Sequence, residues 1–278
     1  MMINKVKTLL KGCALAGTVL VGSVAQAHPM WILPHEFNVS TEEGKGEWVT
    51  FDASASHTIF GFDKGLPLHT VKIFSPDGDS NYIGSYFKGH RRSVFDHYID
   101  QEGTYLFKGQ RPLFHFTSYK SGKRDTPKRM MANKQQAQAR LPKNARDVST
   151  LLIDLTSSTY VTNNKPSDAV LATTGKGLEV KLVTHPNDIV SGEEVEFQMT
   201  LNGKPAEGVE IEITPGGTKY RDDRSSIKLE TKADGLVIFT PELPGPWLFL
   251  ASKQSKVDTP SEDFKLSMRY ITFEVQPE

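Results

Sequence analysis

The sequence predicts a mainly β protein with two β-sandwich domains of the immunoglobulin type, joined by a basic, partly helical segment. Three observations predict this: short alternating stretches rich in β-branched and aromatic residues, turn signals between them, and a change of composition in mid-chain. A length of 278 residues is enough for about two domains. We expect a signal peptide at 1–27, an N-terminal β domain at 28–118, the basic segment at 119–176 and an immunoglobulin-like sandwich at 177–278.

Residues 1–27 have the pattern of a cleavable export signal. A start with three lysines precedes an uncharged run at 12–24 and a small-x-small site at 25–27. The uncharged run is shorter than the roughly 20 residues that span a membrane. We therefore expect cleavage after Ala27, a periplasmic location and no membrane span in the mature chain.

Charge and cysteine content exclude several classes of protein. The chain carries 33 basic and 33 acidic side chains, and loss of the three signal lysines leaves a net charge of −3. This gives no surplus of positive charge for binding nucleic acid. Cys13 is the one cysteine and lies in the signal, so the mature chain has neither disulfides nor thiolate metal sites. Any metal site must use nitrogen and oxygen ligands, with methionine as the sulfur option.

The N-terminal region is predicted to be a set of short strands. The turn at 75–79 contains Pro76, Asp77 and Gly78, which preset φ, bond back to the backbone and accept a positive φ, respectively. The strand candidates around this turn are 48–53, 70–74, 103–107 and 113–117.

The basic segment differs in composition from both β regions. Nine Lys or Arg residues fall between Lys120 and Arg146, against one acidic residue, Asp125. Residues 130–141 are rich in helix formers, and Pro142 follows them. No aromatic residues are interleaved to stack on bases, so we favour a solvated helix or insertion over a nucleic-acid or membrane surface.

The C-terminal region alternates more cleanly between apolar and polar residues. An Asn202-Gly203 pair predicts a two-residue hairpin turn. About seven strands in about 100 residues is typical of an immunoglobulin-like sandwich. The strand candidates are 178–183, 195–201, 209–214, 228–232, 236–240, 247–251 and 270–275.

His28 becomes the first residue after the predicted cleavage and is the strongest candidate for a metal ligand. Its free α-amine and its ring nitrogen can chelate one metal, and a further histidine makes three nitrogens, a set suited to Cu(II), Ni(II) or Zn(II). We expect His57 or His115 to complete the site, with His35 in reserve. The ligands must be deprotonated, so affinity should fall at low pH. The alternative is that His28 is an unstructured terminal residue.

Enzyme activity is not predicted. The chain has no HExxH, GxSxG, GxGxxG or P-loop motif, and its serines lie in no recognisable nucleophile context. A copper-dependent oxidase that uses the same His28 chelate is the least favoured interpretation.

Several motifs, in order, resemble a family of exported bacterial proteins of uncharacterised function associated with nickel and cobalt uptake. The opening His28-Pro29-Met30-Trp31-Ile32-Leu33-Pro34 resembles the start of that family. The later motifs are Gly177-Leu178-Glu179-Val180, His185-Pro186-Asn187-Asp188, Ser191-Gly192-Glu193, Asn202-Gly203-Lys204-Pro205-Ala206, Ala233-Asp234-Gly235, Pro244-Gly245-Pro246-Trp247 and Tyr270-Ile271-Thr272-Phe273-Glu274.

The resemblance implies a periplasmic accessory protein that binds or delivers a transition metal ion, nickel or cobalt or else iron or copper, for uptake. It carries the family's first-domain histidine over to His28, beside Trp31, and Ser56-His57 takes the place of a Gly-His pair. The basic stretch at 119–146 departs from the family pattern. The implied partners are the metal ion and a membrane transporter or outer-membrane receptor. The alternative is an interaction module that docks on such a partner and needs no metal.

Overall fold

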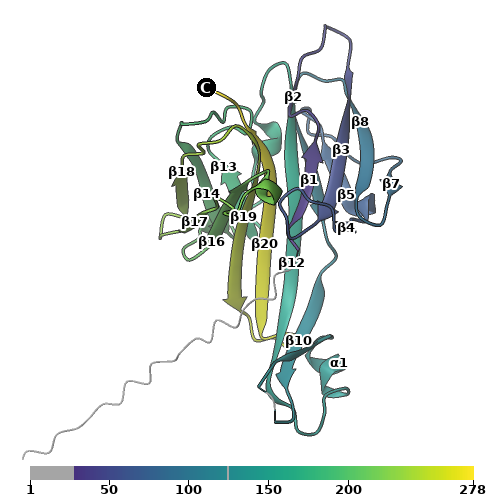
Figure 1. Ribbon diagram of the computed structural model, residues 1–278, viewed down its shortest axis with the longest axis vertical. Coiled ribbons are helices and arrows are strands. Elements are labelled where there is room, and N and C mark those ends of the chain that lie inside the picture. Colours follow the sequence, from purple (N-terminus) through teal and green to yellow (C-terminus); the bar gives the residue numbers. More distant parts are fainter. Residues whose placement is uncertain (1–27, 124) are drawn as a thin grey trace, which may run out of the picture.

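The computed structural model describes residues 28–123 and 125–278, so the predicted signal peptide at 1–27 lies outside the described residues. The described chain is mainly β, and its strands form sandwich-like sheets in an elongated molecule (Figure 1). The predicted mainly β, sandwich-like fold is confirmed. Within this part of the chain, no helix has the length and apolar character needed to cross a membrane.

One sheet belongs to the N-terminal region. Its strands pair in the order β1-β3-β8-β7, and β4 pairs with β3 where β3 ends. Its members are β1 (Met30–Pro34), β3 (Glu47–Ala55), β4 (Lys64–Gly65), β7 (Phe87–Lys88) and β8 (Ser93–Ile99).

A second sheet runs through both halves of the protein, with β12 in the middle (Figure 1). The strand order is β17-β16-β19-β20-β12-β9-β5-β6, and β2, β10 and β11 pair at its sides. The strands are β2 (Asn38–Val39), β5 (Val71–Phe74), β6 (Ser80–Tyr82), β9 (Gly103–Gln110), β10 (Phe114–Lys120), β11 (Lys128–Met131), β12 (Arg146–Asn163), β16 (Glu210–Pro215), β17 (Ile227–Glu230), β19 (Gly245–Lys256) and β20 (Phe264–Val275).

A third sheet covers the C-terminal half. In it β14 pairs with β13, β15 and β18. The Asn202-Gly203 hairpin is confirmed, because Leu201 pairs with Lys204 and both turn residues have positive φ. The strands are β13 (Leu178–Leu182), β14 (Val195–Leu201), β15 (Lys204–Pro205) and β18 (Leu236–Phe239); the short helices are α1 (Lys134–Gln138) and 3₁₀ turns at Leu68–Thr70, Ala169–Leu171 and Thr218–Tyr220.

Three buried apolar clusters hold these sheets together. One lies in the N-terminal half, where the Phe51 and Phe95 rings stack with their centroids 4.6 Å apart. A second fills the C-terminal half around Phe197. The third contains residues of both halves, including Trp31 from β1 and Leu248 from β19. The two halves are therefore packed on one another.

The predicted basic, partly helical segment at 119–176 has more residues in strands than in helices, with α1 and the 3₁₀ turn at Ala169–Leu171 as the helical parts that the structure describes. It contains β12, an 18-residue strand that pairs with β9, β10 and β20. The helix predicted at 130–141 shrinks to α1, because Met130 and Met131 pair with β10 instead. Asn133 caps α1 by accepting a hydrogen bond from the Gln136 backbone N–H.

Strand β12 does not show the usual alternation, because it is buried on both faces over most of its length. Its hydroxyl groups find partners inside the protein, as buried polar groups must. Thr159 Oγ1 donates to the Thr272 carbonyl at 3.0 Å, and Thr104 and Thr162 pair their hydroxyls at 3.0 Å. A run of Ser and Thr thus forms an interior strand.

A buried carboxylate ties β12 to β20. Asp154 on β12 lies 3.0 Å from Arg269 Nη2 and 2.9 Å from Lys265 Nζ, both on β20. Burial opposes ionisation of Asp154, but the two cations outweigh it and hold its pKa below the usual value. Arg269 also donates to the Leu178 carbonyl, which joins the third sheet to this contact.

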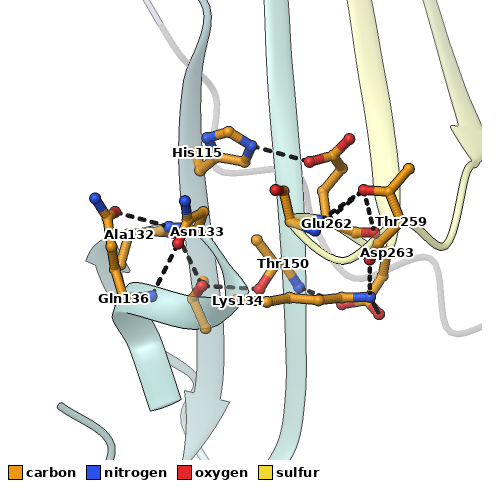
Figure 2. A network of polar contacts seen from close by, with 11 residues as sticks. His115, Ala132, Asn133, Lys134, Gln136, Thr150, Thr259, Glu262 and Asp263 are labelled. Carbon is orange, nitrogen blue, oxygen red and sulfur yellow. Dashed lines mark hydrogen bonds and ion pairs between the residues drawn. The ribbon is translucent and has the colours of Figure 1, made fainter. Parts of the chain in front are cut away.

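A second polar network holds the projecting end of the molecule, where β10, β11 and α1 lie (Figures 1 and 2). Lys134 on α1 lies 2.8 Å from Asp263, in the connection from β19 to β20. The Thr150 N–H donates to the same carboxylate at 2.7 Å. The basic segment is therefore fixed to the C-terminal half.

Replacing Asp154 by Asn should destabilise the fold by roughly 3–5 kcal/mol, because it leaves two cations near a neutral partner in a buried place. The pKa of Asp154 is lower in the folded protein than in the unfolded chain, where it is near 4. The ionised carboxylate therefore stabilises the fold fully above that unfolded pKa, and the stabilisation is lost as the pH falls from there through the folded pKa. Urea unfolding at pH 7 and at pH 3 measures both effects. The matched change Asp147→Asn, on the same strand but exposed, should cost about 1 kcal/mol or less. Equal losses in the two variants would contradict the role given to Asp154.

Replacing Trp31 by Ala should cost about 3–5 kcal/mol of unfolding free energy, since Trp31 is fully buried between the two halves. Trp48→Ala is the control, because Trp48 is 64% exposed and should cost under about 1 kcal/mol. Chemical denaturation monitored by far-UV circular dichroism measures the difference. A Trp31→Ala protein as stable as the Trp48→Ala protein would show that the third cluster does not join the halves.

Candidate functional site

His28 and His57 lie together at one end of the N-terminal sheet. Their ring centroids are 3.8 Å apart, and the ring planes are tilted by 38°. His28 is half-buried, whereas His57 is exposed. Of the four predicted ligands, the structure therefore brings these two into contact.

Strand pairing explains why two residues so far apart in sequence meet. Met30 at the start of β1 pairs with Ala55 at the end of β3. One step further, the Ser56 N–H donates to the Pro29 carbonyl at 3.0 Å. The antiparallel register therefore places the residue before Pro29 beside the residue after Ser56.

The loop after His57 is held by its own polar groups. Asp63 Oδ2 accepts hydrogen bonds from Ser56 Oγ at 2.9 Å and from the His57 N–H at 3.1 Å. Gly61 fits the close turn inside this loop, because a Cβ there would lie 2.8 Å from Ser56 Oγ and 3.0 Å from Thr58 Cβ. The sequence Ser-His-Thr-Ile-Phe-Gly-Phe-Asp thus fixes the backbone that carries His57.

The C-terminal half also holds this loop. Arg224 Nη2 donates to the His57 carbonyl at 2.6 Å, and the Ile59 N–H donates to Thr218 Oγ1 at 3.1 Å. Both partners lie in the segment between β16 and β17. His57 is therefore positioned by both halves of the protein.

Aromatic residues form a rigid base below the pair. The Trp31 ring lies 5.6 Å from Phe60 and 5.5 Å from Phe62, in edge-to-face arrangements. Trp31 follows His28 by three residues, and the two Phe rings belong to the loop after His57. The same cluster therefore anchors both segments that carry the histidines.

The electrostatic surroundings favour a neutral His28 ring. Partial burial, the neighbouring His57 ring and the Lys64 ammonium lower the pKa of His28, against the attraction of Asp63. Hydrogen bonds from the His57 backbone and the Ser56 hydroxyl hold the pKa of Asp63 below its usual value. A neutral imidazole is the form that binds a metal ion.

Two imidazoles side by side can supply two nitrogen ligands. Among the described residues, no group of three or more His, Cys, Asp or Glu side chains could hold a metal ion. A third protein ligand at this place must therefore come from another kind of group. Cleavage after Ala27, if it occurs, supplies one, because it frees the α-amine of His28 itself.

His115 lies at a different level of the molecule. Strand β12 passes both places. His115 pairs with Leu152 of β12, whereas the Ser157 hydroxyl of β12 donates to the carbonyl of Met30, which lies next to the histidine pair. Leu152 and Ser157 are five residues apart, so with a rise of about 3.3 Å per residue these two positions on β12 are roughly 16 Å apart. His115 Nε2 lies 3.1 Å from Glu262 Oε2 instead (Figure 2). The structure therefore does not bring His115 together with His28 and His57.

His35 is also separate from the pair. It follows β1 at the end opposite to His28, and its ring, 62% exposed, lies 3.6 Å from Asp52 Oδ2. Strand β1 lies between the two histidines, so His35 does not reach the pair as a ligand.

Sequence reasoning missed the groups that hold the pair. Asp63, Thr218 and Arg224 lie in loops without a recognisable motif, and two of them are more than 150 residues from His57. The Ser-His dipeptide and the helix-breaking Gly61 are the local signals that mark the loop. Nothing in the sequence indicates which loop of the C-terminal half packs on it.

Comparison with solved structures gives distant neighbours. The D0–D1 domains of intimin are 12% identical with a TM-score of 0.21, covering 87% of this chain and 96% of that chain. The FN1–FN3 domains of chicken CNTN1 are 10% identical with a TM-score of 0.23, covering 89% and 98%. The purple acid phosphatase PPD1 of yellow lupin (Lupinus luteus) is 11% identical with a TM-score of 0.21, covering 90% and 41%. Nothing about the function of this chain follows from likenesses this weak.

Comparison with protein families is more informative. No curated protein matches the chain. A family model described as a domain of unknown function, DUF4198, matches residues 25–255. The prediction of a family of uncharacterised function is confirmed, whereas its association with nickel and cobalt uptake stays a prediction. Because the match spans well over half of the chain, the protein belongs to the DUF4198 family.

Proposed function

We propose that this protein is exported to the periplasm, binds a transition metal ion with His28 and His57, and serves metal uptake as an accessory protein. The observation that carries the proposal is the contact between the two imidazole rings, 3.8 Å apart. Two distant sequence segments and both halves of the fold converge to hold that contact.

The ligand set that we propose is the His28 α-amine, the His28 ring and the His57 ring. Three nitrogens suit Ni(II), Cu(II) and Zn(II), and Co(II) accepts the same donors with lower affinity. Pro29 has no backbone N–H, so its amide cannot be deprotonated to act as a ligand. The chelate must therefore recruit a ligand from elsewhere, and the contact between the His28 and His57 rings supports His57 as that ligand.

The metal proposal is tested with a chain that begins at His28, titrated with Ni(II), Co(II), Cu(II) and Zn(II) by competition with a chelator dye. We expect one site, and at least about a tenfold loss of affinity, or about 1.4 kcal/mol, in His57→Ala and in a chain with one extra Ala before His28. His115→Ala is the matched control, because that ring pairs with Glu262 far from the site. If both altered chains bind as tightly as the unaltered one, the proposed site is wrong.

A second candidate function is a docking module for a membrane transporter or receptor. The observation that favours it is the projecting end of the molecule, where β10 and α1 extend beyond the two sandwich halves (Figure 1) and β11 pairs with β10. Its exposed basic residues include Lys123, Lys128, Arg140 and Lys143. A chain that binds none of the four metals in the titration would leave this function as the better account.

A further inference from the structure

Three cationic residues lie near the loop that carries His57. Arg224 donates to the His57 carbonyl, and Arg91 Nε donates to the Phe62 carbonyl at 2.6 Å while its Nη2 lies 3.7 Å from Asp63. Ala55 at the end of β3 pairs with Met30 of β1 on one side and with Lys64 of β4 on the other. These contacts bring the Arg91 and Arg224 guanidinium groups and the backbone of Lys64 to the end of the sheet where the histidines meet.

Opposite charge at this place comes from Asp63 and, beside Arg224 in the sequence, from Asp222 and Asp223. Asp63 is the carboxylate in contact with the loop, and it already accepts hydrogen bonds from Ser56 and His57 and pairs with Arg91. Lys64, Arg91 and Arg224 are all exposed. Among the described residues, no carboxylate joins the two histidines in a possible metal site, so carboxylate ligands for a bound metal would come from outside the protein, where the exposed cations attract them. The surroundings therefore suit a ligand whose net charge is negative.

Coordination chemistry identifies the class of that ligand. Three protein nitrogens leave open positions on Ni(II) or Cu(II), and carboxylate oxygens can fill them. Arginine forks match carboxylates in geometry, and exposed cations steer anions towards a site. We propose that the site takes its metal ion as a complex with a small polycarboxylate chelator, whose free carboxylates pair with Lys64, Arg91 and Arg224. This inference rests on the proposed metal function.

A purely structural role for the cations predicts a different result. Arg91 and Arg224 hold backbone carbonyls of the loop, so losing them could loosen the site for every form of the metal. Lys64 separates the two explanations, because its position on β4 is set by backbone pairing. Its charge can therefore be removed without removing one of the loop contacts described above.

The test measures the affinity of the chain beginning at His28 for Ni(II) in a non-coordinating buffer and for Ni(II) citrate. Lys64→Gln should bind the citrate complex about two- to fivefold more weakly, and bare Ni(II) equally or more tightly. The double change Lys64→Gln with Arg91→Gln should weaken citrate-complex binding by roughly tenfold. Lys143→Gln, an exposed lysine in the projecting end, is the matched control and should change neither affinity.

Weaker binding of the citrate complex by Lys64→Gln, without weaker binding of bare Ni(II), supports the inference. If Lys64→Gln leaves the affinity for the citrate complex unchanged, or weakens both forms alike, the inference is overturned. A chain that binds bare Ni(II) but not the citrate complex also overturns it, while the proposed metal function stands. A chain that binds neither form removes the metal function itself, so the two failures are distinguishable.

Discussion

Strand β12 must be hydrogen-bonded along both edges, because it is buried and no water reaches its backbone. It meets this demand with β20 on one side, paired in parallel from Leu151 to Thr159, and with β9 and β10 on the other. Its neighbours come from both halves of the chain, so neither half can satisfy β12 without the other. The Asp154 contact with Arg269 and Lys265 adds a charge constraint to the same pairing. The arrangement of the rest of the protein follows from this shared strand.

The histidine pair depends on that arrangement. The Ser157 hydroxyl of β12 bonds to the Met30 carbonyl, and β1 carries His28 just before Met30. The C-terminal half, fixed to β12 through β20, brings Arg224 and Thr218 to the loop of His57. An approach of two rings to 3.8 Å therefore draws on contacts across the whole fold. A site at such a junction is rigid, which lowers the ordering cost that a bound metal would otherwise impose.

Local patterns in the sequence predict local features well. The alternating strands and the Asn202-Gly203 turn are where the apolar pattern and turn chemistry put them. β12 is missed because its Ser and Thr residues are buried on both faces, so it shows no alternation. His28 and His57 can be proposed as ligands from sequence, whereas the separation of His115 from them depends on the register of β10 on β12. Arg224 is beyond sequence reasoning, because its role depends on packing between loops that are distant in the chain.

The central claim is that the first residue of the mature chain and His57 bind one metal ion through three nitrogens. Electron paramagnetic resonance of the Cu(II)-loaded chain beginning at His28, labelled with ¹⁵N, counts the coordinating nitrogens from their hyperfine splitting. The account predicts three nitrogens in the unaltered chain and two in His57→Ala. A spectrum with fewer than three nitrogens in the unaltered chain, or one that His57→Ala leaves unchanged, would contradict it.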